Sequence, residues 1–491
     1  MGQDIDDVTF TREDRAKYRE KVKACLAVLR RMLDEDHFEV ERKLVGVEVE
    51  LCIVDDDGQP VNINAELLAL MESEDFQTEL AQFNIEFNLA PHKLVGRVFR
   101  EIEEELETAF QHATAKARQL DANAVMIGIL PTLDDLHIQL DNISANPRYS
   151  MLNDQILEAR GEDLTFDIEG AERLTLTANS IMMEAAATSV QLHLQVSPDG
   201  FASVWNTAQA ISAPQVALGA NSPWLLGKQL WHETRIAAFA QSIDTRTEEL
   251  TAQGVRPRVW FGEKWIDSIT DLFDENVKYF PALLPLLDEE DPEAVLDRGD
   301  IPHLGELNLH NGTIYRWNRP IYGVARGKPH LRVENRVLPA GPTVVDTLAN
   351  AAFYYGLVRA VTQMDEPITR SMSFHAAEEN FNAAARDGIE AQLFWPGLGR
   401  VPASELVLRT LLPLAAEGLS GWEVNSRDRD NYLGIIEQRA LHRRNGATWQ
   451  IGTVRKLEAG GMDRRAALAQ MTRRYLAHQL TNEPVHTWEL G

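Results

Sequence analysis

The stretch KLVGVEVELCIVDDDGQP, from Lys43 to Pro60, predicts a β-strand over residues 44–54 that ends in a turn at DDDG. Apolar residues in it alternate with Glu48 and Glu50, and side chains two residues apart in a strand share one face. The two carboxylates therefore lie on the same face, about 6.6 Å apart along the strand. Either this face belongs to an edge strand and meets water, or it lines a cavity in which carboxylates hold hard cations.

Three further predicted strands also carry polar side chains between apolar ones. Glu86 lies in NIEFNLAP, and Gln191 and His193 share one face of SVQLHLQ. Glu334 and Arg336 share one face of RVENRVLP. If these strands form one sheet, its concave face gathers carboxylates that repel one another unless cations compensate them. Magnesium fits, because it takes oxygen ligands and bridges carboxylates to nucleotide phosphates, and an arginine there would neutralise a phosphoryl group in transfer.

The order of the predicted elements favours an α+β fold. Strands are predicted at 44–54, 83–89, 124–132, 187–197 and 330–342, and helices at 11–36, 64–73, 94–120, most of 202–250, from Val344, and most of the chain from 375. Helix 11–36 begins with a capping box at Thr11 and Asp14. Single strands between long helices, without a GxGxxG or GxxxxGK[ST] motif, argue against a doubly wound parallel sheet. We predict a catalytic domain over 1–374, with helix 11–36 packed on it, and a helical C-terminal extension over 375–491 packed on the same domain.

The composition limits the class of partner. The chain has 491 residues, and 48 basic against 75 acidic residues give a net charge of −27. This charge argues against a nucleic-acid or anionic-membrane partner, which would need a basic face, but it allows a phosphorylated small ligand held by metal ions and arginines. No apolar run is long enough to span a bilayer, and MGQDIDDVTF lacks the basic start and apolar core of a signal peptide. The two cysteines, Cys25 and Cys52, are expected to be buried thiols, which fits a reducing cytoplasm.

Four stretches in order, GVEVEL, EFNLAP, TSVQLHL and VENRVLPAGPT, resemble the motif set of the glutamate–cysteine ligases, from about Lys43 to Phe353. These enzymes form the carboxylate–amine ligase branch of the glutamine synthetase-like fold. The resemblance implies a mainly antiparallel, curved sheet that forms a funnel-shaped active site flanked by helices. The C-terminal helices resemble only those of the actinobacterial-type members.

The resemblance also implies roles for individual residues. Arg336 would face the γ-phosphate and act in catalysis with Glu334, while Arg148, Tyr149 and Arg235 match positions at which relatives hold the amino-acid substrate. The implied metal ligands are Glu48, Glu50, Glu86 and Glu334, with Glu79 and Gln191 as further candidates. His193 and Arg332 are further candidates for substrate or nucleotide binding.

The implied activity is an ATP-dependent ligation of the γ-carboxylate of glutamate to the amino group of cysteine, with Mg²⁺, or Mn²⁺ in its place. ATP would convert the carboxylate into an acyl phosphate, from which the amine displaces phosphate, and the enzyme would supply positioning and charge compensation. Three alternatives stay open: a ligase for another amine, a guanidino phosphotransferase, and an inactive nucleotide- or metal-binding regulator. The partners expected are small molecules, and the sequence leaves the oligomeric state open.

Some features have two interpretations. His193 is either a core histidine with satisfied hydrogen bonds or a ligand, and Arg332 either binds phosphate or pairs with a neighbouring carboxylate. The stretch HNGTIYRWNRPIYG, residues 310–323, either lines a pocket or forms a surface loop. The stretch RRNGATWQ, residues 443–450, suggests no chemistry.

Overall fold

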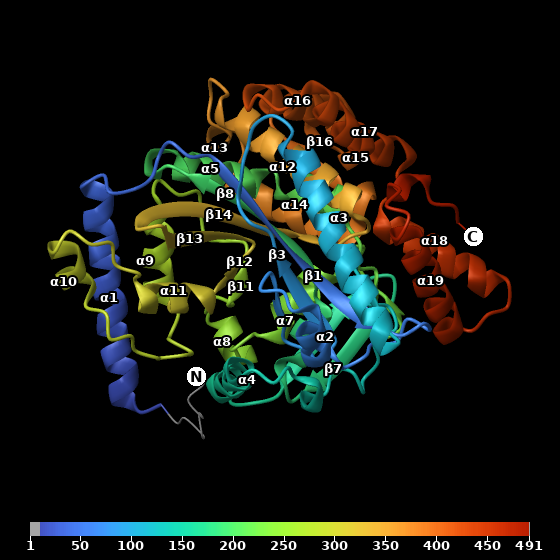
Figure 1. Ribbon diagram of the computed structural model, residues 1–491, viewed down its shortest axis with the longest axis horizontal. Helices are drawn as coiled ribbons and strands as arrows, with labels where there is room; N and C mark the ends of the chain where they lie inside the picture. The colour runs from blue at the N-terminus through green and yellow to red at the C-terminus, as the bar shows by residue number, and fades with distance from the viewer. Residues whose placement is uncertain (1–9, 491) are drawn as a thin grey trace.

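A curved antiparallel sheet lies at the centre of the computed structural model, which describes residues 10–490 (Figure 1). Residues 1–9, which hold most of the stretch examined for a signal peptide, are outside the described residues, as is residue 491. The strand order is β13-β14-β8-β1-β3-β2, and β4 and β5 also pair with β1. The strands are β1 (Leu44–Val54), β2 (Phe76–Thr78), β3 (Asn84–Asn88), β4 (His92–Lys93), β5 (Asn123–Val125), β8 (Ser189–Val196), β13 (Asn318–Ala325) and β14 (Lys328–Pro339).

The register of these strands brings the predicted polar side chains together. Glu50 on β1 lies opposite Glu86 on β3, and Glu48 lies opposite Gln191 on β8. On the other side of β8, His193 lies opposite Glu334 on β14. Because residues directly opposite one another in an antiparallel pair point to the same face, these side chains share one face of the sheet. The predicted fold class, α+β with a mainly antiparallel curved sheet, is confirmed.

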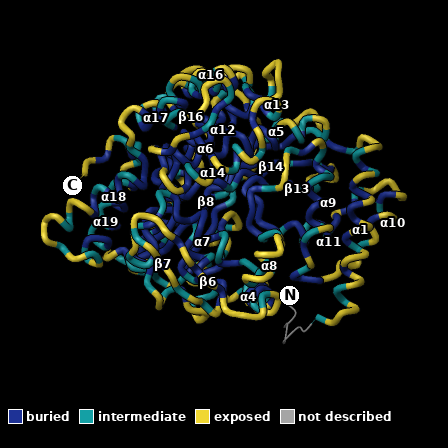
Figure 2. The backbone as a smooth tube through the Cα atoms, turned by 180° about the vertical axis from the view of Figure 1, so that it is seen from behind, coloured by how far each residue is buried: buried dark blue, intermediate teal, exposed yellow. Residues whose placement is uncertain are grey.

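Four helices form a layer against the sheet. They are α3 (Val98–Ala117), α5 (Pro198–Ala210), α6 (Ser212–Gly219) and α12 (Val344–Thr362). Helices α5 and α6 pack directly on β14, and α12 packs against all three of the others. The hydroxyl of Tyr355 on α12 donates to the carbonyl of His193, at 3.0 Å. Figure 2 shows β8, β14 and α12 as buried, with exposed residues on the outer turns.

The first helix, α1 (Arg12–Asp34), packs against α9 (Ile269–Tyr279), α10 (Pro292–Asp297) and α11 (Gly305–Gly312), which lie beside it in Figure 1. Its predicted capping box is present: the amide of Asp14 donates to the Thr11 hydroxyl, and the Asp14 carboxylate accepts from the Thr11 amide. Among the described residues, no helix has the combination of length and apolar character needed to cross a membrane.

The C-terminal region is helical apart from one hairpin. Its elements are α14 (Phe374–Asp387), β15 (Gln392–Trp395), β16 (Gly399–Pro402), α15 (Ala403–Leu406), α16 (Leu412–Gly421), α17 (Ser426–His442), α18 (Gly446–Ala459) and α19 (Arg464–Gln479). Helix α14 packs on α6, and α16 and α17 pack on α12. Their apolar side chains belong to the same hydrophobic core as those of the sheet. The boundary at residues 374 and 375 stays a prediction.

The remaining α-helices and strands within residues 10–490 are five helices and three strand pairs outside the main sheet. The helices are α2 (Asn64–Met71), α4 (Pro147–Arg160), α7 (Thr234–Ser242), α8 (Glu248–Ala252) and α13 (Ile368–Ser371). The strands pair two by two: β6 (Leu164–Glu169) with β7 (Arg173–Ala178), β9 (Trp224–Leu225) with β10 (Lys228–Gln229), and β11 (Val259–Trp260) with β12 (Tyr315–Arg316).

Two predicted segments differ from the structure. The buried strand predicted over 124–132 is a strand only at β5, because tertiary hydrogen bonds replace the ladder beyond it: Gln479 bonds both the amide and the carbonyl of Met126. The helical stretch predicted over 202–250 is divided among α5, α6, α7 and α8, with the hairpin β9–β10 between them. The stretch 310–323, for which two interpretations stood, contains the end of α11, β12 and part of β13.

Candidate active site

A cavity of about 560 Å³ lies against the polar face of the sheet. Besides the sheet strands, its walls come from the turn between β2 and β3, from α4, from α7 and from the 3-10 helix Ile181–Ala186. Its charged lining residues are Glu48, Glu50, Glu79, Glu86, Arg148, Glu184, Arg235, Arg319 and Arg336. The cavity therefore gathers carboxylates and guanidinium groups from segments far apart in the sequence.

One group of carboxylates could hold a cation. Ligand oxygens of Glu50, Glu79 and Glu86 all lie within 4.8 Å of one another. The amide and hydroxyl of Ser189 donate to Glu50 at 2.7 and 2.8 Å, and the Gln191 side chain donates to it at 3.2 Å. These hydrogen bonds fix the carboxylate but supply no positive charge.

The electrostatics of this group also indicate a cation site. Burial raises the pKa of Glu86 to about 7, and the neighbouring Glu48 and Glu50 raise it further, while hydrogen bonds from Asn88 and Gln77 lower it. Burial also raises the pKa of Glu79 well above its ordinary value, and Glu50 and Glu86 add to the effect. Two buried carboxylates and a partly buried one, all with raised pKa values, are the arrangement that a bound divalent cation would relieve.

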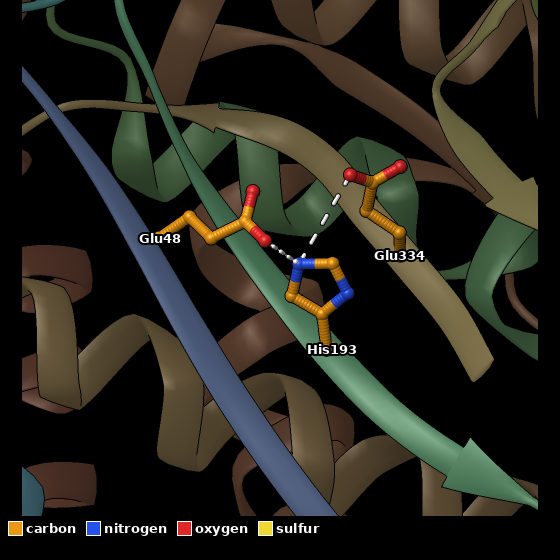
Figure 3. A group of neighbouring side chains, drawn as sticks. All are labelled: Glu48, His193 and Glu334. Carbon is orange, nitrogen blue, oxygen red and sulfur yellow. Dashed lines mark ion pairs between the residues drawn. The ribbon is translucent and has the colours of Figure 1, made fainter. Parts of the chain in front are cut away.

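A second group consists of Glu48, His193 and Glu334, whose side chains point toward one another in Figure 3. His193 Nε2 lies 2.9 Å from Glu48 Oε1 and 4.0 Å from Glu334 Oε1. Neither ring nitrogen has a hydrogen-bond partner among residues 10–490, although both are buried. The donor set of this group suits a cation, and the role of His193 stays a prediction.

Both groups fit a divalent metal ion. Their donors are carboxylate oxygens and one imidazole nitrogen, the ligands that Mg²⁺ or Mn²⁺ takes in proteins. The Asn84 Oδ1 atom, in the wall of the same cavity, is buried and has no hydrogen-bond partner in the described part of the chain. Glu48, Glu50, Glu79, Glu86, His193 and Glu334 are therefore the residues that would hold metal.

Glu334 is also the centre of an ion-pair network. Arg319 on β13 binds it through two nitrogens, one of them at 2.9 Å, and Arg336 Nη1 lies 3.2 Å from its Oε1 atom. Although burial raises the pKa of Glu334, Arg319 and Arg336 lower it well below its ordinary value. Arg336 Nη1 also donates to Gln191 Oε1 at 3.0 Å, so Gln191 connects Arg336 to Glu50. This network holds Arg336 in the cavity with its charge retained.

The backbone at Arg336 is supported from behind by Arg235. The β14–β8 register shifts between Asn335 and Leu338, which marks a bulge at Arg336. Arg235 Nη2 donates to the Val337 carbonyl at 2.6 Å, and its Nε donates to Glu233 at 3.0 Å. Arg235, for which the resemblance implies substrate binding, lines the cavity, but its side chain is buried and its donors are directed at protein atoms.

A match to a protein-family model identifies the family of this chain. The model of "Glutamate-cysteine ligase family 2 (GCS2)" matches residues 44–457, from β1 into α18. The chain belongs to this family.

Two solved structures share the fold of this GCS2 member. A glutamate–cysteine ligase from Francisella tularensis, in complex with AMP, has a TM-score of 0.52 and 13% identity, over 93% of this chain and 91% of that one. A bifunctional glutathione synthetase from Pasteurella multocida has a TM-score of 0.53 and 12% identity, and the match covers 95% of this chain but 55% of the Pasteurella chain. A search of curated protein sequences finds no match.

The remaining predicted residues of the GCS2 chain line either the 560 Å³ cavity or a second cavity next to it. Arg148 and Tyr149 at the start of α4 line the 560 Å³ cavity, and the Tyr149 hydroxyl donates to the Thr78 carbonyl at 3.1 Å. Arg332 instead lines a neighbouring cavity of about 290 Å³, which shares Glu48 with the first. Its basic lining residues are Arg42, His193, Arg326, Lys328, His330 and Arg332. A carboxylate-rich cavity and a more basic one therefore adjoin on the same face of the sheet and meet at Glu48.

The sequence analysis missed two charged residues of the site. Arg319 lies in the stretch 310–323, whose aromatic and basic composition was a signal for a pocket wall. Glu184 lies on the 3-10 helix Ile181–Ala186, between apolar residues and with no periodic pattern to mark it. Tyr315, Trp317 and Phe239 complete the aromatic part of the wall.

Proposed function

We propose that this GCS2 member is an ATP- and Mg²⁺-dependent ligase that joins the γ-carboxylate of glutamate to the amino group of cysteine. The supporting observation is the position of Glu48, which belongs to a metal-binding group and lines both the acidic and the basic cavity. A nucleotide in the basic cavity would present its terminal phosphate to the carboxylates, and an amino acid in the larger cavity would meet it there. The Francisella enzyme of the same fold was solved with AMP, a nucleotide.

The chain's own residues would supply positioning and charge. Bound Mg²⁺ would shield the phosphates and neutralise the carboxylates. Arg336 would stabilise the charge on the phosphoryl group as it moves to the γ-carboxylate, because its guanidinium stays protonated. Burial lowers the pKa of Arg336, but Glu334 and Glu50 raise it, and the net pKa lies above the ordinary value. The acyl phosphate so formed is then attacked by the neutral amine, and phosphate leaves.

The basic cavity explains how the triphosphate would be held. Arg332 Nε is buried and has no hydrogen-bond partner among the described residues, so it is available to donate a hydrogen bond to a phosphate oxygen. We therefore favour phosphate binding for Arg332 over an ion pair. The two cysteines are free and buried, which supports the proposed cytoplasmic location.

The test is phosphate release from ATP by the purified chain with Mg²⁺ and glutamate, with and without cysteine. The ligase predicts release that depends on the amine and a γ-glutamyl product. The same assay with other amines identifies a different acceptor, a guanidino kinase gives a phosphorylated guanidino product, and a regulator gives nucleotide binding without turnover. Glu334→Gln should abolish release, whereas Glu437→Gln, a change of the same kind at an exposed position on α17, should leave it unchanged.

A further inference from the structure

The β14 bulge places two residues, Arg336 and Val337, opposite the single residue Gln191 of β8. A bulge interrupts the hydrogen bonds of the ladder and turns side chains away from the regular direction of the strand. The direction of the Arg336 side chain therefore depends on what holds this short stretch of backbone. The Arg336 amide donates to the Trp317 carbonyl at 2.8 Å, whereas the Arg336 and Val337 carbonyls accept from a side chain.

That side chain belongs to Arg235. Its Nη2 atom donates to the Val337 carbonyl at 2.6 Å, and its Nη1 atom lies 3.5 Å from the Arg336 carbonyl oxygen. The third nitrogen, Nε, donates to Glu233 at 3.0 Å. Within residues 10–490, no buried nitrogen of this guanidinium lacks a hydrogen-bond partner. A substrate carboxylate could therefore bind Arg235 only by displacing acceptors of the protein itself.

Glu233 fixes the orientation of Arg235. The carboxylate is fully buried, and while Oε1 accepts from Arg235, Oε2 accepts from the Asn221 amide at 2.8 Å. The backbone of Glu233 pairs with Ser222 in an isolated β-bridge, and its amide donates to the Ala385 carbonyl at 2.8 Å. Because both carboxylate oxygens and the backbone are held, the planar guanidinium is directed at the bulge.

We propose that Glu233 and Arg235 are positioning residues, which set the direction of the Arg336 guanidinium by fixing the two carbonyls of the β14 bulge. This gives Arg235 a role different from the substrate binding that the family resemblance implies. The inference rests on the proposed function only for the part that Arg336 takes in turnover. A misplacement of about 1 Å can cost roughly a hundredfold in rate even when the mutation lies far from the chemistry, so a buried pair behind the cavity wall can control turnover.

The test compares Glu233→Gln with the matched control Glu275→Gln. Each change neutralises a buried carboxylate that pairs with a buried arginine, and the control pair, Glu275 with Arg316 at 3.0 Å, lies between α9 and β12. Glu233→Gln should lower kcat by roughly a hundredfold and leave the KM values of glutamate and ATP little changed. Glu275→Gln should keep kcat near the wild-type value.

Crystal structures of wild type and Glu233→Gln give a readout that does not depend on turnover. Arg336 Nη1 lies 3.2 Å from Glu334 Oε1, and in the variant we expect this distance to exceed about 3.5 Å, which breaks the hydrogen bond. If Glu233→Gln does not fold, Arg235→Lys serves for the same measurements, because an ammonium group lacks the planar fork that reaches both carbonyls.

An Arg336 side chain that keeps its wild-type place in the variant overturns the proposal. A raised KM of glutamate with kcat preserved also overturns it and would assign substrate binding to Arg235. An equal loss of kcat in Glu275→Gln overturns it as well, because the effect would then be a general loosening of the protein. Wild type without amine-dependent phosphate release contradicts the proposed function instead, and the crystal structures then decide the positioning role.

Discussion

Replacing Glu86 by Gln should stabilise the metal-free protein at pH 8. The substitution removes one negative charge from the group of Glu50, Glu79 and Glu86 and keeps nearly the same shape. Glu86 Oε1 accepts hydrogen bonds from Gln77 at 2.6 Å and Asn88 at 2.9 Å, and an amide oxygen can still accept both. The main change is therefore electrostatic.

The size of the effect follows from the pKa of Glu86, about 7 in the folded protein against 4.5 for the ordinary group. Because the folded-state pKa is the higher one, this carboxyl contributes no penalty below about pH 4.5, and stability is lost as the pH rises toward 7. The difference corresponds to about 3 kcal/mol at pH 8. A chain of this length shifts its melting temperature by about 1 °C per kcal/mol, so we expect a rise of about 3 °C.

Thermal melts at pH 5 and pH 8 measure this prediction in wild type, Glu86→Gln and the control Glu437→Gln. The gain should be large at pH 8 and small at pH 5. Mg²⁺ with a non-hydrolysable ATP analogue should stabilise wild type by about 2.7 kcal/mol at a hundredfold excess over the dissociation constant, and Glu86→Gln by less. If Glu86→Gln melts at or below the wild-type temperature at pH 8, burial and the neighbouring carboxylates do not penalise ionised Glu86 as the structure implies.

Three further outcomes follow. Arg336→Lys should lower turnover by roughly a hundredfold with little change in nucleotide affinity, because lysine lacks the planar guanidinium group that can bind two phosphoryl oxygens at once. A weaker nucleotide affinity with normal turnover would contradict this prediction. Treatment with a chelator should abolish turnover, and Mg²⁺ or Mn²⁺ should restore it; full activity of metal-free protein would exclude the metal groups as the site of chemistry. Gln450→Leu should lower the free energy of unfolding, measured by denaturant titration, by about 1–3 kcal/mol. The substitution removes the hydrogen bonds that Gln450 Nε2 donates to the side-chain and backbone oxygens of Asn221 at 2.9 and 3.1 Å. An unchanged midpoint would show that these bonds are dispensable.

The part of the site that lies on regular strands could be predicted from the sequence. Alternation placed Glu48 and Glu50 on one face, and the same pattern applied to Gln191 and His193 gave the right side of β8. Strand periodicity is exact over such short segments, so the face of each side chain follows from its position. The order of the strands, with β14 beside β8, was not predicted from the sequence and is given by the structure.

The sequence did not reveal two residues whose place in the site depends on irregular backbone or on the pairing of distant strands. Glu184 is on a 3-10 helix, and the role of Arg319 depends on the pairing of β13 with β14, which sets Arg319 opposite Glu334. Such pairings are fixed by contacts between distant segments, and no local period carries them. The surroundings of the His193 ring are likewise a property of the assembled sheet.

The stretch RRNGATWQ, for which the sequence suggested no chemistry, is hydrogen-bonded to the segment that supports the cavity wall. Gln450 on α18 bonds the Asn221 side chain and backbone, the Asn221 amide donates to Glu233 at 2.8 Å, and Glu233 pairs with Arg235. Arg235 in turn holds the backbone beside Arg336 at the β14 bulge. A buried chain of hydrogen bonds therefore connects the C-terminal helices to the backbone beside Arg336. Because each buried polar group in such a chain needs its neighbour, the C-terminal helices help to set the position of Arg336.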